Sequence, residues 1–446
     1  MKSDLKKNLL DNKNRLGIWG CGYIGFTTAV NFAINGVKVV GYDINKELIK
    51  NLNNGKIPIP NLDYWLGFPI DSLIETKLFH ATQEVSEMLS SDIKVHMVAI
   101  PTEKNGEPFN GYLIDVIKNI CKRISSKDSP DLIIIESTLT PGNVEKILVP
   151  AIKKAGKDPY TDCLIGVAPR RDWFHSPEKN LKNLPRVVCG LDKKTTDYVK
   201  DVLSIVCDNL ITASSIKIAE LVKSVENSLL HVPSVYAMQL ARAYPDLDIK
   251  EAFRLAGTHW RIPVYYPSMG TGGYCVPVSS KYVKLGATNP EILTIIDETI
   301  KFDEYEPRFI AEIVKHKGGL KVGILGIAYK GDLKVHTLSP ALSIIDYLTE
   351  MDIKVSVHDP YYSEDEIKDI TGCSYFSYPD GLSQFDTILI IPAHRIYTQT
   401  PREILFKYIK EVRLIMDNMG AWDKFREDFK ESGISYNMVG DPNWCK

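Results

Sequence analysis

One thiol in the C-terminal half of the sequence lies among glycines. The stretch SMGTGGYCVPVSSKY, residues 268–282, places Gly270, Gly272 and Gly273 shortly before Cys275. A residue without a side chain lets other groups approach the backbone closely. The pattern therefore indicates either a nucleophilic thiolate in a loop around its substrate, or a tight turn that contains a buried structural cysteine.

A lysine and an asparagine could assist such a thiol. Lys223 and Asn227 stand four residues apart in a segment with apolar residues at helical spacing, so they share one helix face. The residues around Lys223 are apolar, which indicates partial burial, and buried lysines are often functional. A nearby ammonium group would favour the thiolate form of Cys275. The alternative is an ordinary solvated helix surface.

A glycine-rich turn near the N-terminus has the pattern of a dinucleotide site. Gly20, Gly22 and Gly25 form GxGxxG between a predicted strand and a predicted helix, and Asp43 ends the next strand 18 positions after Gly25. In this context the glycines allow a tight turn, close approach of a pyrophosphate and helix–strand packing. Asp43 would hold the ribose hydroxyls and repel a 2′-phosphate, which favours NAD over NADP. The alternative is a glycine turn followed by a solvated aspartate.

Hydroxyl side chains stand at the ends of two further predicted strands. Thr102 follows the buried run that starts at Val95, and Ser137 and Thr138 end the run that starts at Leu132. Ligands bind at the carboxyl ends of parallel strands, so these residues would line the cofactor cleft, although each could equally cap the next helix. The predicted cofactor-binding residues are Gly20, Gly22, Tyr23, Ile24, Gly25, Asp43, Thr102, Ser137 and Thr138.

The elements that must position these residues predict an α/β protein. Strands and helices alternate in the first part of the chain and again after the polar stretch HKGGLK, with a long helical pattern between them. We expect two Rossmann-like parallel-sheet domains joined by a long central helical region. The predicted domains are residues 1–208, the central region 209–302 and residues 303–446. The active cleft would lie between the two α/β lobes.

The composition excludes several other classes of protein. The 446 residues suffice for two or three domains, and a net charge of −2 predicts neither a nucleic-acid nor a membrane partner. The eight cysteines are scattered without a CxxC pair, which predicts reduced thiols and no metal site. No apolar run is long enough for a signal peptide or a membrane span, so we expect a cytoplasmic protein.

Several ordered motifs together resemble the nucleotide-sugar 6-dehydrogenase family, which contains UDP-glucose and UDP-N-acetylmannosamine dehydrogenases. The resemblance covers the chain from about residue 15 to about residue 440. Each motif is weak alone, but the ordered set is specific. The motifs are GCGYIG at 20–25, Pro-Thr at 101–102, ESTLTPG at 136–142, AELVKSVEN at 219–227, GTGGYC at 270–275, GIAYKGD at 326–332, SPAL at 339–342 and VHDPY at 357–361.

The resemblance implies oxidation of a sugar CH2OH group to a carboxylate by two hydride transfers to two NAD+. Cys275 would capture the intermediate aldehyde as a thiohemiacetal, which the second transfer turns into a thioester that water cleaves. Lys223 would stabilise the developing oxyanion with help from Asn227. Thr138 would position the reacting hydroxyl or a water.

The resemblance also implies the substrate and the assembly, namely a UDP-linked (N-acetyl)hexose and a homodimer formed through the central region. Arg261, 14 residues before Cys275, would reach into the substrate site of a neighbouring subunit, as in the N-acetylated aminosugar branch. Lys330 would contact the nucleotide, which the domain 303–446 would bind. The predicted substrate-binding residues are Arg170, Arg171, Lys223, Asn227, Arg261, Gly272, Gly273 and Lys330.

Three positions depart from the family pattern. Arg170 stands where the family has a glutamate that takes part in acid–base work, and Ser279 stands where it has an aspartate that helps to activate water. Thr337 replaces an arginine that binds the nucleotide. The cysteine and the lysine are retained, but two carboxylates that handle protons and thioester hydrolysis are not.

Three explanations for the missing carboxylates remain open. Arg170 and Arg171 could bind an additional anionic group of the substrate. Another nucleophile, such as an amine, could resolve the thioester. Alternatively, Asp172 or Glu178 could activate the water. The predicted function is thus an NAD-dependent nucleotide-sugar 6-dehydrogenase, with two alternatives: a related enzyme whose thioester is not simply hydrolysed, and a non-catalytic binding protein for NAD or a nucleotide sugar.

Overall fold

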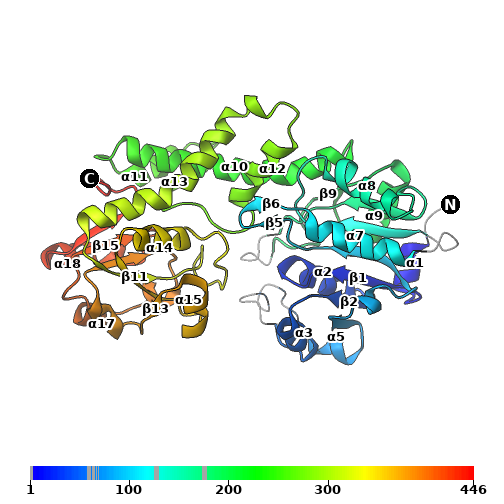
Figure 1. Cartoon of the computed structure of the whole chain (residues 1–446), viewed down its shortest axis with the longest axis horizontal. Helices are drawn as coiled ribbons and strands as arrows, with labels where there is room; N and C mark the ends of the chain where they lie inside the picture. Colours follow the sequence, from blue (N-terminus) through cyan, green and yellow to red (C-terminus); the bar gives the residue numbers. More distant parts are fainter. Residues whose placement is uncertain are drawn as a thin grey trace. The chain divides into compact units, whose positions relative to one another are not determined.

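The computed structural model of the chain describes residues 4–57, 62, 66, 68, 70–124, 130–172 and 178–446. They form two compact units (Figure 1), the first of which contains Met1–Glu226 and Lys281–Pro290 and the second Asn227–Ser280 and Glu291–Lys446. Each unit is built around its own sheet, which confirms the predicted fold with two Rossmann-like domains. The predicted domain boundaries at residues 208 and 302 stay a prediction.

The sheet of the first unit has eight strands in the order β10-β9-β8-β7-β4-β1-β2-β3. Its strands from β3 to β8 follow the Rossmann order 3-2-1-4-5-6, and the order reverses between β1 and β4, where such folds bind ligands. The β8–β9 pair is antiparallel. The strands are β1 Arg15–Trp19, β2 Val39–Tyr42, β3 Phe79–Thr82, β4 Ile93–Val98, β7 Asp131–Ile135, β8 Cys163–Val167, β9 Arg186–Gly190 and β10 Leu210–Thr212, with a small hairpin of β5 Glu103–Lys104 and β6 Glu107–Pro108.

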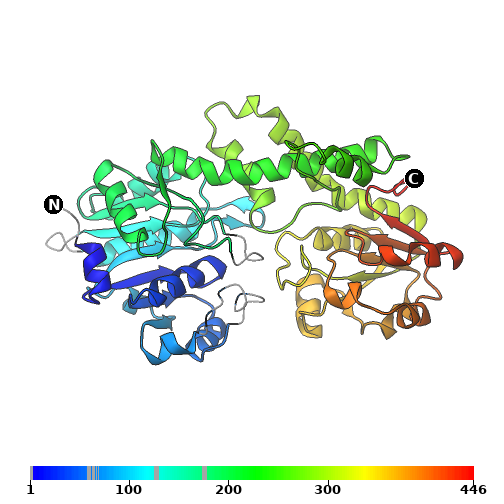
Figure 2. The ribbon, with the colours of Figure 1, turned by 180° about the vertical axis from the view of Figure 1, so that it is seen from behind.

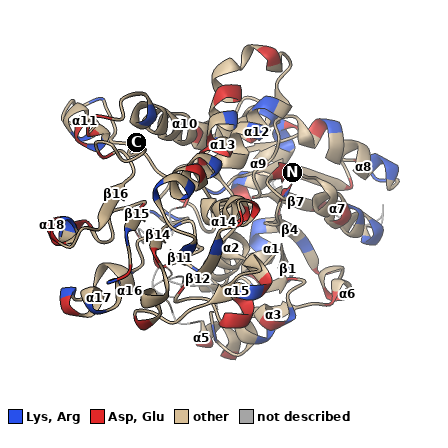
Figure 3. Ribbon diagram, turned by 60° about the vertical axis from the view of Figure 1, so that its left-hand side comes forward, with Lys and Arg blue, Asp and Glu red and all other residues tan. Residues whose placement is uncertain are grey.

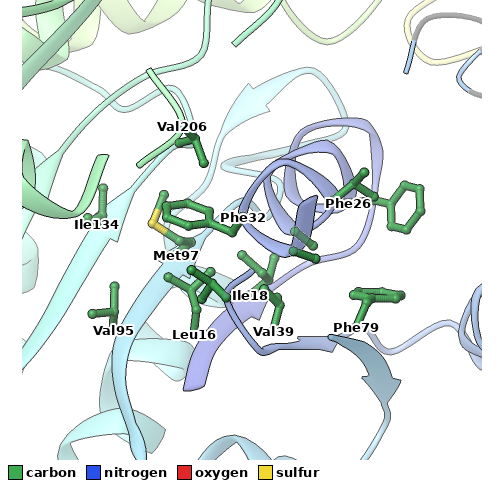
Figure 4. Close-up of a cluster of buried hydrophobic side chains, with 14 of the residues drawn as sticks. Leu16, Ile18, Phe26, Phe32, Val39, Phe79, Val95, Met97, Ile134 and Val206 are labelled. Atoms are coloured by element: carbon green, nitrogen blue, oxygen red, sulfur yellow. The ribbon is translucent and has the colours of Figure 1, made fainter. Parts of the chain in front are cut away.

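Both faces of this sheet are buried, which explains its nearly continuous apolar strands. Successive residues point to opposite faces, so Ile134 belongs to one apolar cluster while Ile133 and Ile135 belong to another. Figure 4 shows the first cluster, in which Phe26 and Phe32 of α2 pack over the sheet. The helices are α1 Leu5–Leu10, α2 Tyr23–Ile34, α3 Lys46–Asn53, α5 Asp71–Glu75, α6 Val85–Met88, α7 Gly111–Arg123, α8 Val149–Lys154 after a π-helical turn at Val144–Leu148, and α9 Lys193–Leu203.

The sheet of the second unit repeats the same order with six parallel strands, β13-β12-β11-β14-β15-β16. Gly326 follows its first strand with φ of +89°, as Gly20 with φ of +91° follows β1. The strands are β11 Lys321–Leu325, β12 Lys354–His358, β13 Ser374–Tyr375, β14 Thr387–Ile390, β15 Leu414–Asp417 and β16 Ser435–Met438. The helices that accompany them are α14 Pro340–Glu350, α15 Glu364–Thr371, α16 Arg395–Thr398, α17 Arg402–Tyr408 and α18 Arg426–Glu431, with 3-10 turns at Asp380–Gln384 and Asp423–Phe425.

The central region is mainly helical, as its apolar spacing predicts. It contains α10 Ile216–Ala243, α11 Ile249–Ala256, α12 Val276–Gly286, a 3-10 turn at Pro290–Ile292 and α13 Thr294–Lys317. Figure 2 shows α10 as one continuous helix despite Pro233 inside it. The region begins with the short strand β10, and residues 258–275, which include the predicted glycine loop, form no helix.

Basic and acidic side chains are interspersed over the helices of each unit (Figure 3), which agrees with the small net charge of −2. Such a surface lacks the single-sign field that steers a strongly charged partner. Within the residues that the structure describes, no helix is both long enough and apolar enough to span a bilayer.

Candidate active site

The turn after β1 has the geometry that a dinucleotide requires. A Cβ on Gly20 would lie 2.5 Å from the Ala99 carbonyl oxygen, and one on Gly25 would lie 1.8 Å from the Gly20 carbonyl oxygen. Helix α2 therefore packs directly against the turn. The Cβ position of Gly22 has no neighbour within 4 Å, so the backbone there is open to a pyrophosphate at the helix N-terminus.

Asp43 lies at the end of β2, next to this turn. Its Oδ2 accepts a hydrogen bond of 2.8 Å from the Cys21 amide, and its Oδ1 accepts one of 2.9 Å from the Asn45 amide. These bonds fix a half-buried carboxylate where Rossmann proteins bind the ribose hydroxyls. Tyr23 and Ile24 form the first turn of α2 beside it. The residues present thus fit NAD.

The hydroxyls at the ends of β4 and β7 have partners within the protein. Thr102 donates to the Thr138 carbonyl oxygen at 2.6 Å, and Ser137 donates to the Ile100 carbonyl oxygen at 2.7 Å. Tyr282 of α12 in turn donates to the Thr102 carbonyl oxygen at 2.8 Å. These bonds tie the two loops together at the switch point. Contact of Thr102, Ser137 and Thr138 with the cofactor stays a prediction.

Glu220, one helical turn before Lys223, holds the loop that contains Thr138. Its carboxylate accepts hydrogen bonds from the amides of Gly142, at 2.6 Å, and Val144, at 2.8 Å. Burial raises the pKa of Glu220 to about 7, although both amides oppose the rise. Sequence reasoning missed this residue. Its spacing of three residues from Lys223, which places both on one side of the helix, was the available signal.

Lys223 is partly buried, as predicted, with 18% of its side chain exposed. Its Nζ lies 4.0 Å from Oε2 of Glu226, the next acid along α10. Oε1 of Glu226 lies 2.7 Å from Nη2 of Arg171. Nη1 of the same guanidinium donates to the Pro185 carbonyl oxygen at 2.9 Å. Arg171 thus has protein partners, and its contact with a substrate stays a prediction.

Arg170 lies in a buried cluster with 2% of its side chain exposed. Its guanidinium donates to both carboxylate oxygens of Asp172, and it reaches α2 by donating to the Thr27 hydroxyl at 3.0 Å, the Thr28 hydroxyl and the Ile24 carbonyl oxygen at 3.2 Å. Protein groups thus occupy the donors of Arg170 in this structure, and its contact with an anionic group of the substrate stays a prediction.

Two more charges complete the cluster. Glu136, at the end of β7, pairs with Arg186 and accepts from the Thr28 hydroxyl at 2.7 Å. Burial alone would raise the pKa of Asp172, but the charge and hydrogen bonds of Arg170, together with the charge of Arg186, outweigh burial and lower it. Asp172 is thus enclosed and paired with Arg170, and activation of water by Asp172 stays a prediction.

Cys275 is exposed and immediately precedes α12. All eight cysteines lie in the described ranges, and the other seven are buried or half-buried. The interpretation of Cys275 as a buried structural cysteine is therefore wrong.

The glycines before Cys275 pack against the ring of Tyr329. A Cβ on Gly272 would lie 2.6 Å from the Tyr329 Cβ, and one on Gly273, which has φ of +86°, would lie 3.1 Å from its Cζ. Burial, and secondarily the charge of Cys275, raise the pKa of Tyr329. The space that these glycines leave is thus used by a side chain of the second unit. Their contact with a substrate stays a prediction.

Three further predicted residues lie near this loop or in the segment that packs on it. Asn227 donates to the Ser279 hydroxyl at 2.9 Å, and both are buried, so Asn227 braces the first turn of α12. The Thr337 carbonyl oxygen accepts from the Gly273 amide at 2.9 Å. Lys330 belongs to the same segment as Thr337, and burial lowers its pKa. Contact of Lys330 with a nucleotide stays a prediction.

Arg261 and Glu178 are both exposed. The Arg261 guanidinium carbon lies 4.5 Å from the ring centre of Trp260, whose side chain is 81% exposed. An arginine stacked on an exposed tryptophan is typical of an interface residue. That Arg261 reaches a neighbouring subunit stays a prediction, as does the activation of water by Glu178.

Fold and site together define an NAD-dependent dehydrogenase with two Rossmann-type units. Three models of the UDP-glucose/GDP-mannose dehydrogenase family match the chain: its NAD binding domain at residues 14–206, its central domain at 217–304 and its UDP binding domain at 323–424. The chain belongs to the UDP-glucose/GDP-mannose dehydrogenase family. It is therefore an NAD-dependent oxidoreductase that acts on a CH–OH group of a nucleotide sugar.

Several relatives share one name. The chain is 28% identical to the UDP-N-acetyl-D-mannosamine dehydrogenase of Methanococcus aeolicus, over 98% of each chain. It is 30% identical to that of Pyrococcus horikoshii, over 78% of this chain and 84% of the relative. The solved structure of the UDP-D-ManNAc dehydrogenase from Pyrococcus horikoshii superposes with a TM-score of 0.81 and 26% identity, over 96% of this chain and all of that chain.

Proposed function

We propose that the chain oxidises the CH2OH group of a UDP-N-acetylhexosamine to a carboxylate through a covalent intermediate on Cys275. The observation that carries the proposal is the exposure of this one thiol at the N-terminus of α12, among seven cysteines that are buried or half-buried. UDP-N-acetyl-D-mannosamine is the first substrate to test, because the relatives carry that name.

The chemistry divides between the cofactor and the protein. NAD+, when bound, supplies the hydride acceptor for both oxidations. The CH2OH carbon loses a hydride and its hydroxyl a proton, which gives an aldehyde, and the Cys275 thiolate adds to that carbon to form a thiohemiacetal. Lys223 stabilises the oxyanion. Loss of a second hydride gives a thioester, and water cleaves its C–S bond to release the acid and the thiol.

A second candidate is a related enzyme in which another nucleophile resolves the thioester. Ser279 supports it, because a buried hydroxyl bonded to Asn227 occupies the first turn of α12, where the family has a water-activating carboxylate. Such an enzyme would make the same two NADH, but its product would be an ester or an amide.

The first experiment counts NADH formed per UDP-N-acetyl-D-mannosamine consumed and identifies the product by mass spectrometry. Two NADH and a free carboxylate support full oxidation with hydrolysis. Two NADH and an acylated product favour the second candidate. A single burst of NADH equal to the enzyme indicates a thioester that is not resolved. NAD+ binding without turnover on a panel of nucleotide sugars would indicate a binding protein. Replacement of Cys275 by Ala should abolish turnover and leave NAD+ binding intact.

We also propose a cytoplasmic homodimer. Large apolar side chains are exposed on consecutive elements of the second unit, with Leu229 and Tyr236 on one face of α10, Leu255 on α11 and Trp260 just after it. Leu229 and Tyr236 stand two helical turns apart, as the contact face of a helix requires. Eight cysteines without a disulfide suit a reducing compartment.

A further inference from the structure

A buried histidine connects three helices behind the Cys275 loop. His231 of α10 is 1% exposed, and its Nε2 lies 3.1 Å from Oδ2 of Asp303 on α13. Its Nδ1 lies 2.9 Å from the hydroxyl of Ser280 on α12, the helix that Cys275 precedes. One imidazole thus joins α10, α12 and α13 within the second unit.

Asp303 extends this connection into the glycine loop itself. Its Oδ1 accepts a hydrogen bond of 2.8 Å from the backbone amide of Thr271, and its Oδ2 accepts one from the Thr271 hydroxyl. Thr271 lies between Gly270 and Gly272, which have no side chain to anchor the loop. Hydrogen bonds to a carboxylate are stronger than neutral ones, so this pair restrains both the backbone and the side chain of Thr271.

His231 and Asp303 lie in a buried region, where an uncompensated charge is energetically unfavourable. Asp303 is 7% exposed, and a carboxylate at such a depth must be compensated by donors. Glu306 lies three residues after Asp303 on α13, where it is fully buried and paired with Arg242 at 3.2 Å. His231 and Thr271 contact Asp303 and compensate its burial. The position of the glycine loop and the burial of the Asp303 carboxylate therefore depend on each other.

The order Ser280, His231 and Asp303 is that of a nucleophilic triad, but the burial excludes that use. Ser280 is 0% exposed within α12, and its hydroxyl also lies 3.5 Å from the Ser228 hydroxyl. No substrate carbonyl can approach an oxygen enclosed in this way, whereas triad serines present theirs to the substrate. The contacts instead lead from the helices to Thr271 and the segment before Cys275.

We propose that His231 and Asp303 are positioning residues for Cys275, which hold its glycine loop through Thr271 and its helix through Ser280. The inference rests on the proposed role of Cys275 as the nucleophile. A nucleophile reacts efficiently only from a near-attack geometry, and a displacement of about 1 Å can lower a rate by ~100-fold. Loss of the restraint at Thr271 should therefore lower kcat without affecting the NAD site of the first unit.

The test compares Asp303→Ala and Asp303→Asn by hydrogen–deuterium exchange and by kinetics with UDP-N-acetyl-D-mannosamine. Asp303→Ala should speed amide exchange in the peptide that contains Thr271 and lower kcat by at least about tenfold, with an unchanged Kd for NAD+. Asp303→Asn keeps one acceptor oxygen for the Thr271 amide and should recover most of both. Thr271→Val, which removes only the hydroxyl bond and spares the helices, should lower kcat in the same direction but less.

Leu405→Ala is the control, because Leu405 is fully buried on α17 of the same unit, in an apolar cluster that includes none of these residues. Leu405→Ala should lose as much thermal stability as Asp303→Ala, but amide exchange at Thr271 and kcat should stay normal. The inference is overturned if Asp303→Ala exchanges and turns over like the wild type, or if Leu405→Ala reproduces its effects. Full turnover by Cys275→Ala would instead overturn the proposed function, and exchange at Thr271 still tests the restraint without turnover.

Discussion

At the scale of single residues, Arg170 and Asp43 use their charges in opposite ways. The guanidinium of Arg170 donates its hydrogen bonds to groups inside the protein, and the carboxylates of Asp172 and Glu136 balance its charge. Asp43 is half-buried, and its carboxylate has about four acceptor sites, of which the amides of Cys21 and Asn45 use two. The remaining capacity of Asp43 is available to ribose hydroxyls, whereas Arg170 has little left for a ligand.

Replacing Arg170 by Met should destabilise the first unit. The change leaves the buried carboxylate of Asp172 without its ion-pair partner, which typically costs about 3–5 kcal/mol. Urea unfolding monitored by tryptophan fluorescence would measure the loss. Arg171→Met is the matched control, because that side chain is one-third exposed and should cost less than about 1 kcal/mol. A raised KM for the nucleotide sugar with unchanged stability would show that Arg170 binds substrate after all.

Replacing Asp43 by Asn should weaken the binding of NAD+. Loss of a charged acceptor for the ribose hydroxyls is expected to cost about 1.5 kcal/mol, or roughly a tenfold increase in Kd. The preference for NAD+ over NADP+ should narrow at the same time, because the repulsion of a 2′-phosphate disappears. Fluorescence titration with both nucleotides measures the two effects. Asp11→Asn, at the exposed C-cap of α1, should change neither Kd. Unchanged Kd values for Asp43→Asn would refute the assignment of Asp43 to the ribose.

At the scale of elements, α10 organises the site along one stripe. Glu220, Lys223, Asn227 and His231 recur at intervals of three or four residues, which places them on one side of the helix. Glu220 binds the loop after β7, and Asn227 and His231 bind α12 and α13. Three of these four residues therefore connect α10 to neighbouring segments, which explains why polar side chains recur along this side of the helix.

Glu220 should make the stability of the protein depend on pH. Its pKa is raised to about 7 in the folded protein and lies near 4.5 when the chain is unfolded, so the folded state binds the proton more tightly. The stabilisation from this proton is complete below about pH 4.5 and is lost as the pH rises through 7. Glu220→Gln cannot ionise, so the stability of the wild type relative to this variant should fall between pH 5 and 8, by at most about 3 kcal/mol.

Urea unfolding of both proteins at several pH values measures this difference. Glu47→Gln, at an exposed position in the first turn of α3, is the control and should run parallel to the wild type. A constant difference between the wild type and Glu220→Gln across the range would show that the folded protein does not perturb Glu220.

At the scale of the whole molecule, the two Rossmann units share a topology but not a cofactor site. Asp359 follows β12 as Asp43 follows β2, and its Oδ2 accepts from the Ile327 amide at 2.9 Å, as Asp43 accepts from Cys21. Asp359, however, is 1% exposed and lies 3.3 Å from Nε2 of His394. A carboxylate enclosed in this way cannot receive a ribose, so only the first unit has the geometry for NAD.

The proposed homodimer predicts twice the mass of one chain in analytical ultracentrifugation. Replacing both Leu229 and Trp260 by Ser should shift the protein toward monomer, because these exposed side chains would lose an apolar contact area. Leu320→Ser is the control, since Leu320 is equally exposed but lies at the start of β11. A monomeric wild type at micromolar concentration, or a dimer in the double variant, would contradict the proposed interface.

Much of the fold could be predicted because its signals are local. The apolar runs that start at Val95 and Leu132 form most of strands β4 and β7, as predicted. Apolar runs and helical periods are set by neighbours in the chain, so one segment suffices to show them. The strand β10 was missed, because its three residues are too few to show the alternation that indicates a strand, and its pairing with β9 uses backbone groups that every sequence has.

The sequence by itself determined the two Rossmann-type units, the NAD turn with Asp43, and the candidate nucleophile Cys275, since each depends on residue types at short spacing. Only the tertiary structure decided which partners the polar residues have. It enclosed Arg170 with Asp172, packed Tyr329 on the glycines, and joined His231 to Asp303 across 72 positions of the chain. Burial and pairing of charge depend on groups that are distant in sequence, so no local pattern contains them.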